Sequence, residues 1–243
     1  MKFFSALLLV AILASCSKGT GYVDKAQINN QKIDGAVKLY DEFNNEQDFG
    51  GMLVSIEGTN YSAVTDTSGK FELAGIPYGT YNLVFTKSGF GTFKIDTLNH
   101  SNDGDGKPVV LGTFQLGQQA STATTGIFFK SGADTVKMYV TVNPPGTYFI
   151  GRGVRLFYST DTLVSSSNYM AYSDVLIARD STDVFKFGYQ QFQDMGFSSG
   201  EKVFVRPYGD AFFSNDYTDI TTGKRIFPNL NNSATASQSF VLP

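Results

Sequence analysis

The chain has 243 residues, 17% of them charged, and a formal net charge of −3 at pH 7. This length suits one or two domains of about 100 to 150 residues each, and the acidic balance gives no sign of the basic face that nucleic-acid binding usually needs. With one cysteine, Cys16, and one histidine, His100, the chain cannot form an intramolecular disulfide or a zinc site of Cys and His ligands.

The first residues have the features of an export signal. Lys2 precedes the apolar run 3–14, which is too short to span a bilayer core of about 30 Å but is typical of the apolar region of a signal peptide. We therefore expect a signal peptide at 1–15. The polar residues 16–32 show no sustained period and predict a tether.

The end of this signal resembles the lipobox of bacterial lipoproteins, in the sequence Leu13-Ala14-Ser15-Cys16. The resemblance implies cleavage before Cys16 and lipid on that cysteine, and two or more acyl chains hold a protein stably at a membrane. Ser17 then favours the outer membrane, on either its periplasmic or its cell-surface face. An ordinary secretory signal with a chance cysteine is the alternative.

Residues 33–116 alternate apolar and polar positions between turn signals, and the abundant Phe, Tyr and Gly suit such a β-rich chain. Val37 and Leu39 share one face of the first expected strand, and the clusters 65–69 and 75–79 predict turns. Six or seven short strands with no helical period predict an antiparallel β-sandwich. The further apolar positions of the expected strands are Met52, Val54, Ile56, Phe71, Leu73, Tyr81, Leu83, Phe85, Phe93, Ile95, Val109, Leu111, Phe114 and Leu116.

This segment also resembles the carboxypeptidase regulatory-like domain, a transthyretin-like sandwich that is similar to Cna B-type repeats. The motifs that carry the resemblance are Gly35 to Val37, Met52 to Ile56, Thr65 to Phe71, Gly79 to Tyr81, and Gly89-Phe90. The resemblance implies a noncatalytic scaffold. Its Gly and aromatic residues are explained by turns and core.

The loop 101–107, SNDGDGK, imitates the first half of a calcium-binding loop. Gly112 stands where a bidentate Glu would be needed, so a solvated turn is the preferred interpretation and no metal site is predicted. His100, beside this loop, is expected to be a surface residue rather than a catalytic base.

Residues 117–243 predict a second sandwich, loosely similar to a fibronectin type III or immunoglobulin-like module. The segment 117–126 is either a linker or an edge strand. The expected strands carry Val136, Met138, Val140 and Val142; Val154, Leu156 and Tyr158, opposite Arg155 and Phe157; Val175 and Ile177; Phe185, Phe187 and Tyr189; Val203, Val205 and Pro207; and Phe240-Val241-Leu242.

One long irregular segment, 208–230, stands where such a module would have a short hairpin. Long loops in compact domains are often functional, and aromatic rings beside Asp and Asn suit sugar binding. A minor hairpin whose aromatic residues fill its own core is the alternative. The ligand-binding candidates are Tyr208, Phe212, Phe213, Asp216, Tyr217 and Asp219, with Tyr169 and Tyr172 as weaker ones.

These features predict an all-β protein of two antiparallel β-sandwich domains in tandem after a lipoprotein signal peptide, with no catalytic residues and no cofactor. The function expected is that of a noncatalytic, lipid-anchored outer-membrane or surface protein, an accessory or carbohydrate-binding component of a glycan-uptake system. The alternative is a structural spacer or adhesin-like protein that holds a partner protein at the surface. The expected partners are the membrane through lipidated Cys16, an outer-membrane transporter or another surface lipoprotein, and glycan, with no nucleic acid. An enzyme with paired carboxylates has no supporting motif.

Overall fold

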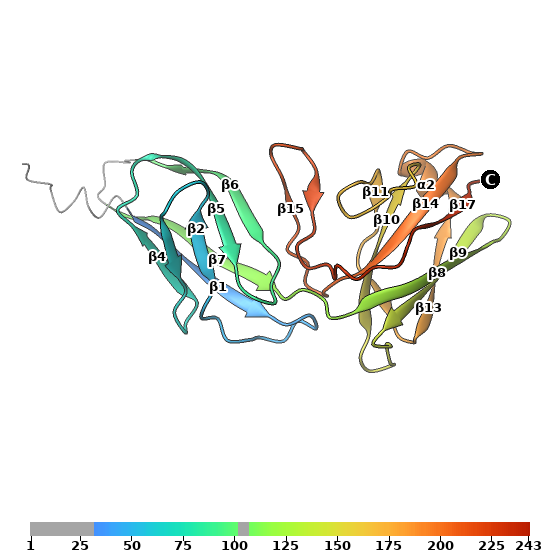
Figure 1. Ribbon diagram of the computed structural model, residues 1–243, viewed down its shortest axis with the longest axis horizontal. Helices are drawn as coiled ribbons and strands as arrows, with labels where there is room; N and C mark the ends of the chain where they lie inside the picture. The colour runs from blue at the N-terminus through green and yellow to red at the C-terminus, as the bar shows by residue number, and fades with distance from the viewer. Residues whose placement is uncertain (1–31, 102–106) are drawn as a thin grey trace, which may run out of the picture.

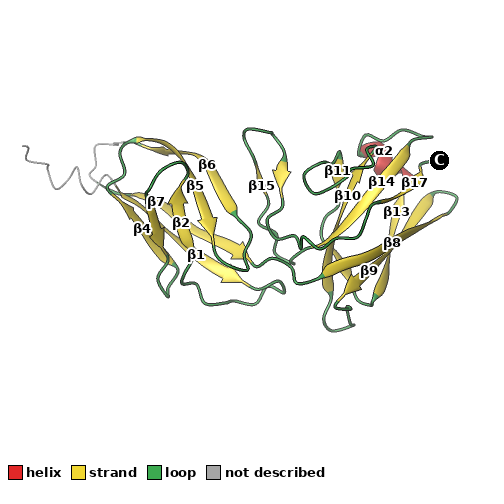
Figure 2. Ribbon diagram, viewed as in Figure 1, coloured by secondary structure: helices red, strands yellow, loops and turns green. Residues whose placement is uncertain are grey.

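The computed structural model describes residues 32–101 and 107–243 as two β-sandwiches that follow each other along the long axis of the molecule (Figure 1). Figure 2 shows that strands make up nearly all of the regular structure. The predicted all-β class and sandwich architecture are confirmed. The signal peptide, Cys16 and most of the calcium-like loop lie outside the described residues, so the predicted lipidation stays a prediction.

The first sandwich packs a three-stranded sheet, β4-β1-β7, against a four-stranded sheet, β3-β2-β5-β6. Its core contains the inward residues predicted from the alternating pattern, among them Val37, Leu39, Phe71, Leu83 and Phe85. The strands are β1 (Lys32–Tyr40), β2 (Leu53–Ile56), β3 (Ser62–Val64), β4 (Lys70–Ala74), β5 (Gly79–Thr86), β6 (Phe93–His100) and β7 (Val109–Gly117).

One pairing departs from the fully antiparallel arrangement that the sequence predicted. β1 and β7 are parallel, with Ile33 opposite Val109 and Tyr40 opposite Gly117. Parallel neighbours need a long crossover connection, and the five strands between β1 and β7 supply it. The first and last strands of this sandwich thus lie side by side.

His100 is a second correction, because it is fully buried rather than a surface residue. β6 continues as far as His100, which pairs with Gly79 at the start of β5. The imidazole Nε2 lies 3.1 Å from the carbonyl oxygen of Ile76, and the ring centroid lies 5.2 Å from that of Tyr78. Strand pairing therefore turns this side chain under the 75–78 turn.

The second sandwich packs the sheet β13-β9-β8 against the sheet β11-β10-β14-β17, in which β12 also pairs with β10. Val136, Met138, Val140 and Val142 alternate into the core, as predicted. The strands are β8 (Ala123–Ser131), β9 (Thr135–Asn143), β10 (Arg152–Ser159), β11 (Ala171–Tyr172), β12 (Leu176–Ala178), β13 (Thr182–Gly188), β14 (Lys202–Gly209) and β17 (Gln238–Val241).

A short helix, α2 (Tyr189–Asp194), follows β13 and is the red element in Figure 2. Tyr189, predicted to continue the strand, begins this helix instead. The side chain of Gln191 accepts a 2.7 Å hydrogen bond from the backbone N–H of Gly188, which caps the first turn. The buried Phe192 then packs into the core.

Candidate functional site at the junction of the sandwiches

The segment 208–230, here called the junction segment, lies between the two sandwiches (Figure 1). It leaves β14, forms a small hairpin of β15 (Tyr217–Thr218) and β16 (Arg225–Ile226), and returns to the second sandwich. Its backbone touches that of both neighbours. A Cβ atom on Gly91 would lie 1.9 Å from the oxygen of Pro228, and one on Gly209 would lie 1.7 Å from the oxygen of Thr122. Only glycine permits such approaches.

Two buried asparagines fasten the junction segment to the end of β7. The amide Nδ2 of Asn229 donates to the carbonyl oxygens of Gly117, at 2.6 Å, and Gln118, at 3.1 Å. Its Oδ1 accepts a 2.6 Å hydrogen bond from the backbone N–H of Asn215. The side chain of Asn215 in turn bonds to the backbone of Gly117 and Gln115. These contacts hold the two sandwiches in one relative position.

Most of the predicted ligand-binding residues make structural contacts within this junction. Tyr208 is buried in a cluster with Phe157 and Phe227. The rings of Phe213 and Tyr217 lie 5.7 Å from Tyr40 and 5.9 Å from Phe93 of the first sandwich.

The two predicted acidic residues also contact their own segment. Asp216 forms an ion pair with Arg225. Asp219 accepts the backbone N–H of Thr222 at 2.8 Å and that of Thr221 at 3.0 Å, and these bonds, together with the Thr222 hydroxyl, lower its pKa. Phe212 differs from the other candidates because it is 38% exposed and lines a groove.

A buried ion pair lies beneath the junction segment. The Arg155 guanidinium donates to the Asp210 carboxylate at 2.7 Å and to the Ser173 carbonyl at 2.7 Å, and it lies over the ring of Phe227 at 4.6 Å. Burial raises the pKa of Asp210, and the charge of Arg155 opposes that effect. Arg155 can be buried on the outer face of its sheet because the junction segment covers it.

The groove that Phe212 lines has a volume of about 340 Å³ and receives residues from both sandwiches. The rings of Phe212 and Phe43 meet edge to face, with centroids 5.8 Å apart. The backbone N–H of Phe212 donates to the carbonyl oxygen of Glu42 at 2.9 Å, which joins the junction segment to the loop after β1. The remaining lining residues are Asn45, Phe149, Ile150 and Gly151.

Charged and polar groups border this aromatic groove. Arg152 lies over the ring of Phe43 at 5.3 Å, and its Nη1 is 3.9 Å from a carboxylate oxygen of Glu42. The other contacts of the Glu42 carboxylate are the backbone N–H and the hydroxyl of Ser121. Aromatic faces beside an amide, a carboxylate and a guanidinium can stack on an apolar ring and bond to its polar substituents.

One wall of the groove is an exposed apolar tip, Tyr148-Phe149-Ile150, whose residues are 78%, 90% and 51% exposed. The rings of Tyr148 and Phe149 meet at 90° with centroids 5.2 Å apart. The tip is held by the bond from Thr147 N–H to the Ile150 carbonyl, at 2.8 Å, and by Arg179, which donates to the Tyr148 carbonyl at 2.9 Å.

The tip and Phe43 are absent from the residues predicted from the sequence. Three consecutive large apolar residues after Pro144-Pro145-Gly146 are the signal that could have identified the tip, because a turn rarely exposes such a run without use.

A larger cavity, of about 570 Å³, lies in the first sandwich near the start of β1. Its lining includes Asp34, whose Oδ1 has no hydrogen-bond partner among the described residues and whose pKa is raised by burial. The aromatic residues of the junction do not take part in it, and Phe71, which lines it, belongs to the core. We therefore treat the junction groove as the candidate site.

Within residues 32–101 and 107–243, no group of three or more His, Cys, Asp or Glu side chains is placed to hold a metal ion. Among the same residues, no helix is long and apolar enough to cross a bilayer.

Several solved structures resemble this chain weakly. A type II cohesin–X-dockerin complex from Acetivibrio cellulolyticus shares 25% identity over 35% of this chain and 56% of that chain, just over half its length, with a TM-score of 0.30. A candidate carbohydrate-binding protein from Bacteroides uniformis shares 13% identity over 87% and 98% of the two chains, with a TM-score of 0.33.

A DUF3823 family protein from Bacteroides ovatus shares 11% identity over 87% and 98% of the two chains, with a TM-score of 0.30. TM-scores this low do not bear on function. No curated protein sequence matches the chain. Residues 38–151 match the model of the carboxypeptidase regulatory-like domain, so the match continues past the predicted boundary at residue 116. The chain therefore contains a carboxypeptidase regulatory-like domain, as the motifs of its first sandwich predicted.

Proposed function

We propose that the protein is a noncatalytic, lipid-anchored surface protein that binds carbohydrate in the groove between its two sandwiches. The observation that supports this most is the meeting of Phe43, Phe149 and Phe212 around a cavity bordered by Asn45 and Arg152. Ring faces stack on the apolar face of a sugar, and the polar groups at the border bond to its hydroxyls. Ligand sites occur often at domain junctions of this kind.

The groove is tested by affinity electrophoresis of the full chain through gels that contain neutral polysaccharides, such as xyloglucan, galactomannan or amylopectin. Phe149→Ala and Phe212→Ala should each weaken the affinity measured from the retardation about two- to tenfold, because an aromatic contact contributes about 0.5–1.5 kcal/mol beyond its buried area. Leu163→Ala is the matched control, since Leu163 is also apolar and exposed, at 75%, but does not line the groove.

Equal retardation of the wild-type protein and both Phe variants would show that the groove is not the sugar site. A wild-type protein that none of these gels retards, and that binds nothing on an array of neutral glycans, would overturn the carbohydrate proposal as a whole.

The alternative is that the protein holds a partner protein, and the exposed tip Tyr148-Phe149-Ile150 favours it. A contiguous exposed apolar patch is typical of a docking surface, and Phe149 is 90% exposed. Pull-down from solubilised membranes with the wild-type protein and with Phe149→Ala distinguishes the two functions. Loss of a specific transporter or lipoprotein from the variant, without any change in glycan retardation, would favour the docking role.

The membrane attachment is proposed from Cys16, which lies outside the described residues. A Cys16→Ala variant should lose metabolic labelling with a fatty-acid analogue and leave the detergent-rich phase on phase separation. A variant that keeps both properties would contradict lipidation at this residue.

A further inference from the structure

The outer face of the sheet β13-β9-β8, here called the platform, carries three rows of side chains in register across its strands. The first row is Lys130, Lys137 and Lys186. The second is Phe128, Tyr139 and Val184, and the third is Gly126, Thr141 and Thr182. Each row contains directly opposite residues, and the opposite face of the same strands faces the core. The platform is therefore a cationic row, an aromatic and aliphatic row, and a hydroxyl row laid side by side.

The cationic row is not explained by the fold. Neighbouring strands lie about 4.8 Å apart, so the three lysines share a strip roughly 10 Å long. Like charges directly opposite each other in a sheet destabilise it. Among the described residues, the ion pairs found do not include Lys130, Lys137 or Lys186, and all three are exposed.

Among the described residues, the acidic side chains close to the platform do not form ion pairs with these lysines. The carboxylate of Asp183 accepts the backbone N–H groups of Arg179 and Val184, both at 2.7 Å. Asp134 lies in the exposed turn between β8 and β9. The row thus presents three positive charges to whatever approaches the sheet.

The second row offers ring surface next to these charges. Phe128 and Tyr139 stack with centroids 4.4 Å apart and an interplanar angle of 7°. The Nζ atom of Lys130 lies 5.2 Å from the centroid of the Tyr139 ring, which joins the cationic row to the aromatic one. Phe128 is still 48% exposed and Val184 43% exposed, so this row remains accessible.

The third row adds hydroxyl groups on the other side of the rings. The hydroxyl oxygens of Thr141 and Thr182 are 2.9 Å apart and share one hydrogen bond. Gly126 completes the row without a side chain, which leaves the backbone open beside them.

We propose that the platform binds an acidic polysaccharide, a polymer of sugars that carry carboxylate or sulfate groups. A sugar of this kind has an anionic group, an apolar ring face and hydroxyl groups, which match the first, second and third rows respectively. The charge complementarity decides between acidic and neutral sugars, because three cations in a row without ion pairs among the described residues gain little from a neutral chain. The regular spacing suits a linear polymer that lies across the strands.

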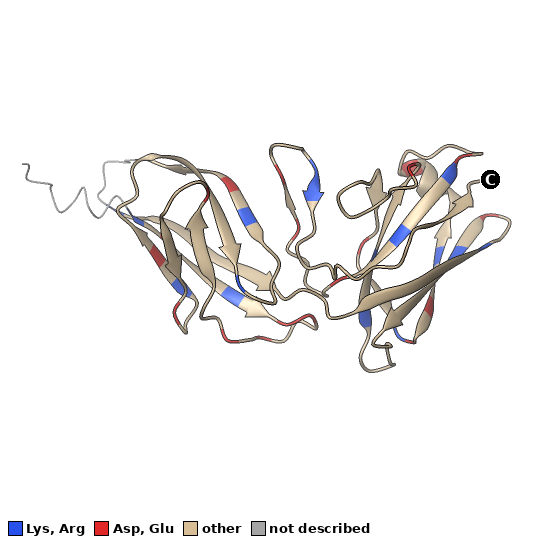
Figure 3. Ribbon diagram, in the orientation of Figure 1, with Lys and Arg blue, Asp and Glu red and all other residues tan. Residues whose placement is uncertain are grey.

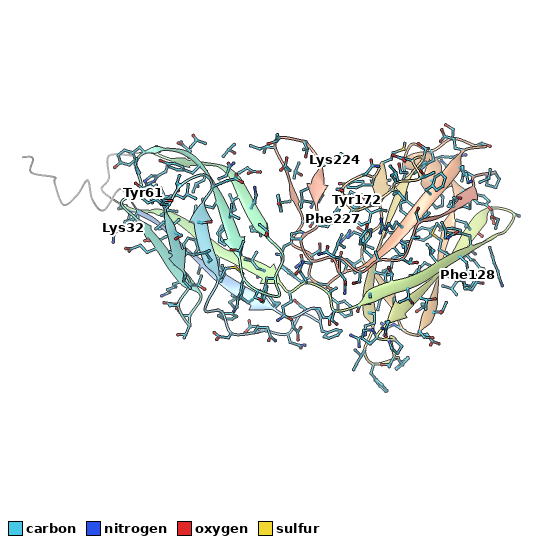
Figure 4. All side chains as sticks on the ribbon, in the orientation of Figure 1. Lys32, Tyr61, Phe128, Tyr172, Lys224 and Phe227 are labelled. Atoms are coloured by element: carbon cyan, nitrogen blue, oxygen red, sulfur yellow. The ribbon has the colours of Figure 1, made fainter. Side chains whose placement is uncertain are left out.

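The platform is separate from the junction groove and does not depend on the function proposed there. None of its residues lines the groove. In Figure 4, the labelled Phe128 lies at the opposite end of the molecule from the labelled Lys32. Figure 3 shows Lys and Arg positions on the strands of this second sandwich.

The test is binding of the full chain to polygalacturonate, with its fully methyl-esterified form as a control ligand that has the same sugar but no charge. Isothermal titration at 50 mM and 500 mM NaCl should show binding of the acid form that weakens with salt, and binding of the ester at least tenfold weaker. The triple variant Lys130→Gln, Lys137→Gln and Lys186→Gln should lose at least tenfold in affinity. Phe128→Ala should weaken binding at both salt concentrations, because stacking is not screened.

Two further variants separate the platform from net charge and from misfolding. The triple variant Lys38→Gln, Lys70→Gln and Lys202→Gln removes the same charge from exposed lysines elsewhere. It should keep the affinity of the wild-type protein. Replacing the three platform lysines by arginine keeps the charge and should also keep binding.

Equal loss in both glutamine triples, or equal binding of the acid and ester forms, would overturn the proposal. So would binding of phosphatidylglycerol vesicles or single-stranded DNA with no binding of polygalacturonate. Because the junction variants Phe149→Ala and Phe212→Ala leave the platform intact, they should bind polygalacturonate normally even if the groove proposal fails.

Discussion

Asn229→Ala is expected to loosen the junction segment from the first sandwich. The Asn229 side chain donates to the carbonyl oxygens of Gly117 and Gln118 and accepts the backbone N–H of Asn215, in a site where Asn229 is only 1% exposed. Alanine removes these three bonds and leaves their buried partners without replacements. At about 0.5–1.5 kcal/mol net for each hydrogen bond, the expected loss in the free energy of unfolding is about 2–4 kcal/mol.

Thermal unfolding followed by circular dichroism measures this loss. For a chain of this length, about 1 kcal/mol lowers Tm by roughly 2–4 °C, so the variant should unfold about 4–15 °C below the wild-type protein. Asn232→Ala is the control, because Asn232 is exposed on the same return to the second sandwich and should shift Tm by less than about 1 °C. If the Tm of Asn229→Ala falls by no more than that of Asn232→Ala, the asparagine bonds do not hold the junction.

Two further predictions concern charged groups near the junction segment. Arg155→Met should lower the free energy of unfolding, measured in urea, by about 3–5 kcal/mol, because it leaves the buried carboxylate of Asp210 without its partner. The double variant Arg155→Met with Asp210→Leu should recover much of that loss. A single variant as stable as the wild-type protein would contradict this. The pKa of Asp219 is lowered by the bonds from Thr222 and Thr221, so its carboxylate stabilises the fold above the ordinary value of 3.8 and this contribution is lost as the pH falls through the lowered folded pKa. Asp219→Asn should therefore show a smaller fall in Tm between pH 6 and pH 2 than the wild-type protein, and an identical pH profile would refute the assignment.

The class of the fold and the cores of both sandwiches follow from the local pattern. Alternating residues such as Val136, Met138 and Val140 place one face of a strand in the core whatever the neighbouring strand is. The same alternation does not reveal which strands pair. The parallel pairing of β1 and β7 depends on contacts between residues far apart in the sequence. The burial of His100 depends on how far β6 continues.

In the platform too, the sequence shows which side chains point outward, and the strand pairing decides which of them become neighbours. The alternation of Lys137 and Tyr139 with buried neighbours shows in the sequence that both point outward. Only the register of β8, β9 and β13 places the lysines of three strands in one row and the rings in another, because a shift of one residue in either pairing would separate them.

The junction segment was identifiable from the sequence as a long aromatic loop, but its role was decided by the tertiary structure. Hydrophobic side chains bury against whatever surface is nearest, and here that surface includes the first sandwich, which receives Phe213 and Tyr217 on Tyr40 and Phe93. The sequence by itself determined the strands, the turns and the family of the first domain, since these depend on residues close together in the chain. The groove and the platform arise only when distant segments meet, because their residues come from different strands and, in the groove, from both sandwiches.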